Sequence, residues 1–327
     1  MAKIDASNRK VKVAMIGAGG MANYVHYPSL ASLEDVEFAG ICDIDTERMN
    51  TTGDKYGIEK RYTDYRKMIE ETAPDAVYAV GLPTFMYPVW VWCLEQGMNM
   101  FVEKPLGITS HQANILAYLA EQNNCITQVG FQRRNAPIAV KMKEECEKKG
   151  QIFHSVCEFY KFHIVPYTQA ADRLVDDGIH AVDTIRWMCG GEVVKVHSQM
   201  KKIGVPDNNY VSAIIEFDNG STGILLNTWA SGRRVFRLQM HAPGAVAEVD
   251  IEGKASLYLD GDTTGTTYDT KEVSGGEEFY EFGGFKAKNR EFIDSLKSGK
   301  PASSNFADAV KTIELAETIV AQNQLSK

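Results

Sequence analysis

Residues 10–22 read Lys-Val-Lys-Val-Ala-Met-Ile-Gly-Ala-Gly-Gly-Met-Ala, and this stretch decides the fold. The β-branched residues of Val11–Ile16 predict a short buried strand. Gly17, Gly19 and Ala22 follow as G-x-G-x-x-A. The first glycine permits a tight turn, the second lets a pyrophosphate approach the backbone, and the small third residue lets the next helix pack closely. The stretch therefore predicts a phosphate-binding loop, although an ordinary glycine-rich turn also fits this pattern when it is taken alone.

A carboxylate further along the chain favours the dinucleotide interpretation. Residues 36–42 predict a second buried strand, and Asp43 follows it, 21 residues after Ala22. A carboxylate at this place accepts a hydrogen bond from the ribose of an adenosine. The alternative is a solvated carboxylate at a strand end. With the loop and Asp43 together we expect NAD rather than NADP, because Asp43 repels a 2′-phosphate, although the nearby Arg48 complicates that preference.

The composition limits the partners and the location of the protein. The chain has 327 residues and a net charge of -8, so we expect about two domains and neither nucleic acids nor anionic membranes as partners. No apolar run reaches the roughly 18 residues of a membrane span, and the first ten residues are mostly polar, which predicts a soluble, cytoplasmic protein. The six cysteines have no C-x-x-C spacing, which predicts buried free thiols and no metal site.

Strands and helices alternate through the first 130 residues. This alternation predicts an α/β domain with a doubly wound parallel sheet, whose ligands bind beyond the carboxyl ends of the strands. Further strands are predicted at 76–80, 98–102 and 126–130, and helices at 23–34, 46–56, 62–71, 89–96 and 109–123.

Two of these strand ends carry candidate functional residues. A turn of Gly81, Leu82, Pro83 and Thr84 is placed to wrap the nicotinamide ribose. The other strand ends in Glu103-Lys104-Pro105, where the proline favours an extended Lys104 that faces the same crevice. From the residues alone, a surface Glu–Lys pair before a turn is favoured over a catalytic pair.

The pattern changes to strict alternation from Gln151 onward. It predicts a large, open, mostly antiparallel sheet, so the whole chain combines an α/β domain with an α+β domain. One sheet face is free for a helix and substrate, and the other for a second subunit. The predicted strands are 152–165, 193–203, 211–217, 222–229, 235–241, 245–251 and 255–259, with helices at 139–149, 285–296 and 306–324. We expect domains at 1–130 and 131–300, with a C-terminal helix in 301–327 packing back on the first domain.

One helix, predicted at 173–189, interrupts these strands. Its spacing places four residues on one face, namely Asp176, His180, Asp183 and Trp187. Gly178 inside such a helix costs about 1 kcal/mol relative to alanine, which a close approach of cofactor or substrate would explain. The alternative is an exposed acidic helix with one histidine.

These motifs, taken together, resemble those of the Gfo/Idh/MocA family (glucose–fructose oxidoreductase and inositol dehydrogenase). The resemblance covers the whole chain and rests on motifs in family order: Gly17-Ala18-Gly19-Gly20-Met21-Ala22, Asp43, Glu103-Lys104-Pro105, Gly130-Phe131-Gln132-Arg133-Arg134 and the Asp-x-Gly-x-His of 176–180. Two departures are Tyr87, where many members have histidine, and Asp177, where the family residue is usually apolar. The resemblance implies an NAD(P)-dependent dehydrogenase of sugars, sugar derivatives or inositols. It also implies a cis Lys104–Pro105 peptide.

The candidate residues follow from these motifs. His180 is the candidate general base, Asp176 would orient it or hold the sugar, and Lys104 would stabilise alkoxide character, in a site expected between the domains. The candidate cofactor residues are Gly17, Gly19, Gly20, Met21, Ala22, Asp43, Arg48, Gly81, Leu82, Pro83, Tyr87, Glu103 and Lys104. Weaker substrate candidates, for which a structural role is as plausible, are Gln132, Arg133, Tyr160 and His163.

The leading interpretation is an NAD-dependent dehydrogenase that converts a secondary hydroxyl of a sugar, glycoside or inositol to the ketone, or the reverse. We expect it to act as a homodimer or homotetramer through the outer sheet face. Two alternatives stay open. One is a dinucleotide-binding sensor without turnover, and the other is a glycoside-processing enzyme that keeps and recycles its NAD.

Overall fold

The computed structural model describes residues 9–325, and the chain divides into two compact units. The first unit comprises the chain up to Gly130 together with Phe285–Val310. The second comprises Phe131–Gly284 and the chain from Lys311 onward. The boundary at 130 agrees with the expectation, but the expected end of the second domain at 300 is wrong, because the segment from Phe285 belongs to the first unit.

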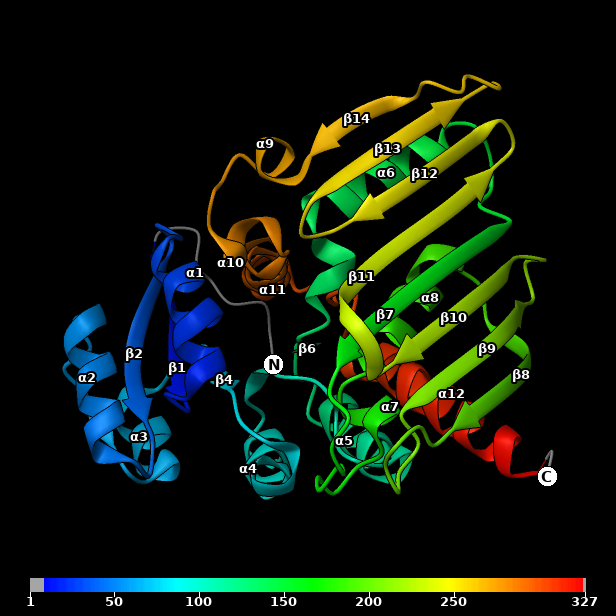
Figure 1. Ribbon diagram of the computed structural model, residues 1–327. Coiled ribbons are helices and arrows are strands. Elements are labelled where there is room, and N and C mark those ends of the chain that lie inside the picture. The colour runs from blue at the N-terminus through cyan, green and yellow to red at the C-terminus, as the bar shows by residue number, and fades with distance from the viewer. Residues whose placement is uncertain (1–8, 326–327) are drawn as a thin grey trace. The chain divides into compact units, whose positions relative to one another are not determined.

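The first unit is a six-stranded parallel sheet in the order β3-β2-β1-β4-β5-β6, which is the doubly wound arrangement predicted (Figure 1). Its strands are β1 (Val11–Ile16), β2 (Val36–Cys42), β3 (Arg61–Tyr62), β4 (Ala76–Ala79), β5 (Asn99–Val102) and β6 (Thr127–Val129). Its helices are η1 (Ala22–His26), α1 (Tyr27–Ala31), α2 (Thr46–Tyr56), α3 (Tyr65–Thr72), α4 (Pro83–Glu95), α5 (Ser110–Gln122) and α11 (Phe285–Ser298).

The core of this unit lies on both faces of the sheet. Helices cover each face, so strands such as Ala76–Ala79 are buried throughout and read as continuous apolar runs. Phe292 of α11 packs edge-on against Tyr78 and Phe101, with ring centroids 5.6 and 5.9 Å away. Burial of such a side chain contributes about 1.5–3 kcal/mol, which explains why α11 joins this unit despite its distance in sequence.

The second unit is an eight-stranded sheet in the order β14-β13-β12-β11-β7-β10-β9-β8, in which only the β7–β10 pair is parallel. The strands are β7 (His154–Phe162), β8 (Val193–Lys201), β9 (Tyr210–Phe217), β10 (Thr222–Thr228), β11 (Ala230–Ala242), β12 (Ala245–Asp250), β13 (Lys254–Leu259) and β14 (Thr266–Asp269). The helices are η2 (Gln132–Asn135), α6 (Pro137–Glu147), α7 (Arg173–Asp176), α8 (Ile179–Cys189), α9 (Thr270–Ser274), α10 (Phe279–Phe282) and most of α12 (Phe306–Leu325).

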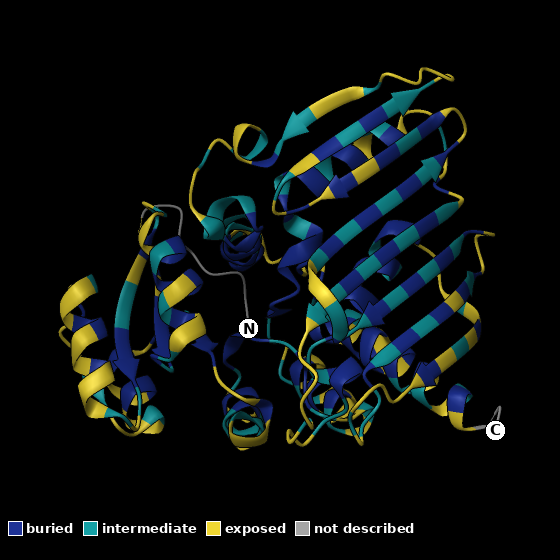
Figure 2. Ribbon diagram, in the orientation of Figure 1, coloured by how far each residue is buried: buried dark blue, intermediate teal, exposed yellow. Residues whose placement is uncertain are grey.

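The two faces of this second sheet differ in burial. Along β7, Ser155, Cys157 and Phe159 are buried, whereas the alternate residues are half-buried, and Figure 2 shows the same alternation on the neighbouring strands. Helix α8 packs on β7 and β10, and α6 packs on β11 and β12. We call the face under these helices the inner face and the opposite one the outer face.

The C-terminal helix differs from the expectation. From Lys311 onward α12 belongs to the second unit and packs beside β8. Ser198 Oγ donates to the Ile319 carbonyl at 2.6 Å, and Met200 N donates to Asn323 Oδ1 at 2.9 Å. The prediction that residues 301–327 pack back on the first domain is therefore wrong beyond Val310.

The helix predicted at 173–189 is two helices that meet at Asp177 and Gly178. A Cβ on Gly178 would lie 2.8 Å from Asn227 Nδ2 and 2.9 Å from a methyl of Leu174. A side chain at position 178 would therefore crowd Asn227 of β10 and Leu174 of α7. None of the helices within residues 9–325 combines the length and the apolar character of a membrane span.

Candidate active site

The glycine loop of the first unit has the geometry that a diphosphate requires. Gly17 has φ +104°, and a Cβ there would lie 2.1 Å from the Val80 carbonyl oxygen, so only glycine fits. A Cβ on Gly20 would meet nothing within 4 Å, and one on Gly19 only the tip of Arg48 at 3.8 Å. The helical segment begins at Gly20, so its free N–H groups and this open space lie together.

Asp43 lies beside this loop and holds it. Its Oδ2 accepts from Ala18 N at 2.7 Å and its Oδ1 from Asp45 N at 2.9 Å. Arg48 is exposed and is tied to Asp45 by an ion pair of 2.9 Å. A carboxylate directly after the second strand is the group that binds the adenosine ribose in dinucleotide-binding folds of this kind, and Asp43 is the residue here that could do so.

The segment after β4 differs from the predicted turn. Helix α4 begins at Pro83, with Leu82 as its N-cap, so only Gly81 and Leu82 remain outside the helix. A proline at the first helical position is favoured, because its missing N–H would have no partner there. Tyr87 lies inside α4 and is half-buried.

A buried pair that the sequence did not indicate supports the Glu-Lys-Pro segment. His26 is fully buried, and its Nε2 lies 2.7 Å from Glu103 Oε1. Glu103 Oε2 accepts from Lys104 N at 3.2 Å, and a Cβ on Gly130 would lie 2.8 Å from Glu103 Oε1. The carboxylate therefore joins the first helix to the ends of β5 and β6. The Lys104–Pro105 peptide is cis, as predicted, and Lys104 is half-buried.

The junction of α7 and α8 in the second unit carries Asp176 and His180, both half-buried. The Tyr167 hydroxyl donates to Asp176 Oδ2. Asp177, which stands where the family residue is usually apolar, also has hydrogen-bond partners. Its carboxylate accepts from Lys161 Nζ at 2.7 Å and from Trp229 Nε1 at 2.7 Å. The unusual aspartate is thus satisfied by groups of β7 and the end of β10.

Asp183, predicted on the same helix face, has different surroundings. Asp183 is fully buried and forms an ion pair with Arg134, whose Nε lies 2.9 Å from Asp183 Oδ2. Asp183 also accepts from Thr312 Oγ1 at 3.2 Å. This pair anchors α8 to η2, so Asp183 has a structural role one turn after His180.

The weaker substrate candidates are scattered in the second unit. Gln132 and Arg133 are buried, and Arg133 contacts Glu252 at 3.1 Å and the Phe236 ring at 4.5 Å. Burial lowers the pKa of Arg133, and Glu252 opposes this effect. Tyr160 lies on the outer face, where it donates to Glu158 at 2.8 Å, so the structure does not bring it to α8. His163 is exposed and lies 3.0 Å from Arg173 through its Nδ1.

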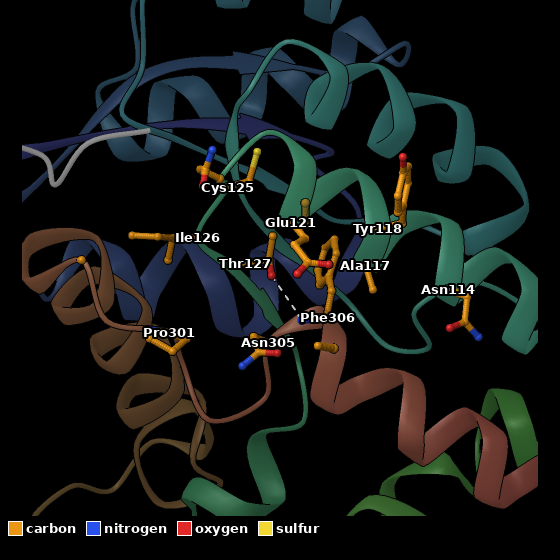
Figure 3. A pocket seen from close by; sticks show the side chains of 14 residues that line it. Asn114, Ala117, Tyr118, Glu121, Cys125, Ile126, Thr127, Pro301, Asn305 and Phe306 are labelled. Carbon is orange, nitrogen blue, oxygen red and sulfur yellow. Dashed lines mark hydrogen bonds between the residues drawn. The ribbon is translucent and has the colours of Figure 1, made fainter.

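A cavity of about 810 Å³ in the first unit is lined by residues of α5, of β6 and of the start of α12 (Figure 3). It opens at the amino end of β6, whereas the loop follows the carboxyl end of the parallel strand β1. Thr127 Oγ1 accepts from Phe306 N at 3.2 Å, and Asn305 caps α12 through Asp308 N. These hydrogen bonds stabilise the start of α12. Within residues 9–325 no group of three His, Cys, Asp or Glu side chains is arranged to hold a metal.

The doubly wound sheet, the glycine loop after β1 and the carboxylate after β2 define a dinucleotide-binding α/β protein. The chain belongs to the GFO_IDH_MocA oxidoreductase family. Residues 11–131 match the model described as "Oxidoreductase family, NAD-binding Rossmann fold", and residues 150–248 match "GFO/IDH/MocA C-terminal domain". The resemblance stated from the motifs is confirmed, and the protein is an oxidoreductase with NAD as its cofactor.

Individual relatives agree with this assignment. The chain is 24% identical to Myo-inositol 2-dehydrogenase of Thermotoga maritima over 319 residues, covering 91% of this chain and 92% of that protein. It is 28% identical to D-glucoside 3-dehydrogenase of Escherichia coli (strain K12) over 215 residues, covering 62% of this chain and 61% of that protein. A solved dehydrogenase from Chromobacterium violaceum has the same fold, with a TM-score of 0.88, 20% identity and coverage of 97% and 96% of the two chains.

Proposed function

We propose that this protein is an NAD-dependent dehydrogenase that oxidises a secondary hydroxyl of a sugar, glycoside or inositol to the ketone, or catalyses the reverse reaction. The observation that carries the proposal is the junction of α7 and α8 in a chain of this oxidoreductase family, where half-buried Asp176 ends α7 and half-buried His180 lies in the first turn of α8. The names of the inositol and glucoside dehydrogenases among its relatives support the class of substrate.

Three side chains have proposed roles in this reaction. His180 accepts the hydroxyl proton, because an imidazole titrates near neutral pH. Asp176 orients the imidazole or holds a neighbouring hydroxyl, and Lys104 donates to the oxygen as alkoxide character develops. When bound in the first unit, the nicotinamide supplies the hydride acceptor. The residues that would hold NAD there are Gly17, Gly19, Gly20 and Asp43.

The test is NADH formation on a panel of inositols, free sugars and glycosides. We expect turnover on at least one neutral polyol. Substrate conversion without release of NADH would indicate a recycled cofactor. NAD binding without conversion of any compound would contradict the proposal and favour a sensor.

We expect kcat/KM to be at least about 10-fold higher with NAD than with NADP, which corresponds to about 1.4 kcal/mol of discrimination. Asp43 would face the 2′-phosphate, and like charges in proximity are costly. Measuring kcat/KM with both cofactors checks this expectation. Arg48→Ala is the matched control: it should leave the preference nearly unchanged, because Asp45 already holds Arg48. A wild-type preference for NADP would refute the prediction.

We also propose that the protein is a homodimer or homotetramer through the outer face. Ile214, Ile224 and Val156 are cross-strand neighbours on β9, β10 and β7, and Ile214 is 48% exposed. An apolar stripe of this kind on a sheet face is typical of an interface. Light scattering should give a mass above that of one chain, and Ile214→Asp should lower it. A monomeric wild-type protein at micromolar concentration would contradict this proposal.

A further inference from the structure

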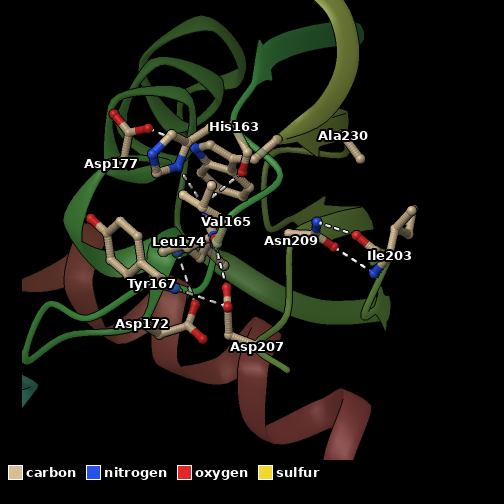
Figure 4. Close-up of polar contacts among 12 residues, drawn as sticks. His163, Val165, Tyr167, Asp172, Leu174, Asp177, Ile203, Asp207, Asn209 and Ala230 are labelled. Carbon is tan, nitrogen blue, oxygen red and sulfur yellow. Dashed lines mark hydrogen bonds and ion pairs between the residues drawn. The ribbon is translucent and has the colours of Figure 1, made fainter. Parts of the chain in front are cut away.

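The segment between β7 and α7 is largely exposed but firmly attached. Residues 162–166 and 168–170 are exposed, and Tyr167 between them is half-buried. Arg173, which is 1% exposed, donates to Asp207 and to the Val165 carbonyl, and its Nη1 lies 3.0 Å from His163 Nδ1. Tyr167 N donates to Asp207 Oδ1 at 3.0 Å (Figure 4). The backbone at Tyr167 is therefore held at a defined place.

This attachment brings the Tyr167 side chain to the α7–α8 junction. Its hydroxyl donates to Asp176 Oδ2, and its ring lies 4.7 Å from the guanidinium carbon of Arg173. Burial raises the pKa of the Tyr167 hydroxyl, and the hydrogen bond to Asp176 raises it further. The hydroxyl consequently keeps its proton and acts as a donor at neutral pH.

Several carboxylates lie near Asp176, and the cationic side chains among them pair with other carboxylates, so a hydrogen-bond donor to Asp176 is favourable. Three further carboxylates belong to the same region, namely Asp172, Asp177 and Asp207, and the cationic groups are Arg173 and Lys161, with His163 beside Arg173. Lys161 contacts both oxygens of Asp177 at 2.7 Å, and Arg173 contacts Asp207. Tyr167 adds a neutral donor to Asp176, and charge-assisted hydrogen bonds of this kind are the stronger ones.

We propose that Tyr167 is a positioning residue, which orients the Asp176 carboxylate for catalysis and is itself placed by the Arg173–Asp207 pair. This inference rests on the proposed dehydrogenase function, and it extends the Asp-x-Gly-x-His motif by a residue from a separate segment. Tyr167 acts through Asp176 and takes no part in proton transfer.

The experiment compares Tyr167→Phe, Asp176→Asn and the double variant on the best substrate of the wild-type enzyme. We expect Tyr167→Phe to lower kcat by roughly 10- to 100-fold, the range for losing a hydrogen bond to a charged group. The KM for NAD should stay unchanged, since the loop that binds it is in the first unit. In the Asp176→Asn background, Tyr167→Phe should have almost no further effect.

Tyr62→Phe is the matched control. It also removes a tyrosine–carboxylate hydrogen bond, from Tyr62 to Glu71 at 2.9 Å, and should leave kcat unchanged. Thermal unfolding of Tyr167→Phe should stay close to that of the wild type. The inference alone is overturned if Tyr167→Phe has a normal kcat, or if it lowers kcat as much in the Asp176→Asn background as in the wild-type background. A wild-type protein that turns over no polyol overturns the proposed function and this inference with it.

Discussion

Replacement of His180 by alanine is expected to lower kcat by roughly 10²–10⁴-fold, the usual range for the loss of a general acid–base group. His180 stands half-buried in the first turn of α8, one turn after Asp176 along the chain. Affinity for NAD should hardly change, because the glycine loop belongs to the first unit. Steady-state kinetics on the best substrate and titration of NAD binding measure the two effects.

Lys104→Ala tests, in the same assay, the proposed role of Lys104 in stabilising the developing alkoxide. It should also depress kcat, and the double variant with His180→Ala should be less than additive if the two side chains act as a unit. A His180→Ala enzyme with near-normal kcat across pH 6–9, about the range where an imidazole base titrates, would show that the proton acceptor is another group. Lys104 itself or a water molecule would then be the better candidate.

The second large effect concerns stability. Asp183→Ala is expected to cost about 3–5 kcal/mol of unfolding free energy, because it leaves the buried Arg134 guanidinium without its carboxylate. It also removes the acceptor of the Thr312 hydroxyl. Equilibrium unfolding in urea, followed by a probe in the second unit, measures the loss.

The control for this prediction is an exposed ion pair of the same unit. Glu216→Ala removes the partner of Lys195, at 3.8 Å on neighbouring strands, and should change the stability little, since exposed pairs are screened by solvent. Replacing Arg134 by methionine together with Asp183→Leu should recover much of the loss, because no buried charge is then left unpaired. If Asp183→Ala were as harmless as Glu216→Ala, the pair would not anchor α8.

The inferences that succeeded from the sequence are those that depend on local chemistry. Gly17 has a positive φ angle directly after β1, and Asp43 follows β2, whose apolar run is visible in the chain. Both features lie within one βαβ unit, so spacing alone locates them. The alternation of β7 likewise predicts a half-buried strand, although only the packing of α8 says which face is inner.

The tertiary structure decided what depends on contacts between distant segments. The His26–Glu103 pair joins residues 77 positions apart, and α11 joins the first unit through aromatic contacts that no local pattern contains. The close approach of Gly178 to the side chain of Asn227 on β10 likewise joins segments far apart in sequence.

The candidate site divides in the same way. Sequence determined that the chain carries a glycine loop, an aspartate directly after the second strand and an Asp-x-Gly-x-His motif, because each is a short pattern with its own spacing. Only the tertiary structure decided that Tyr160 faces away from α8 and that Tyr167 reaches Asp176. The physical reason is that side-chain direction within one strand follows a period of two, whereas the path of a connecting segment depends on the ion pairs that hold it, here Arg173 and Asp207.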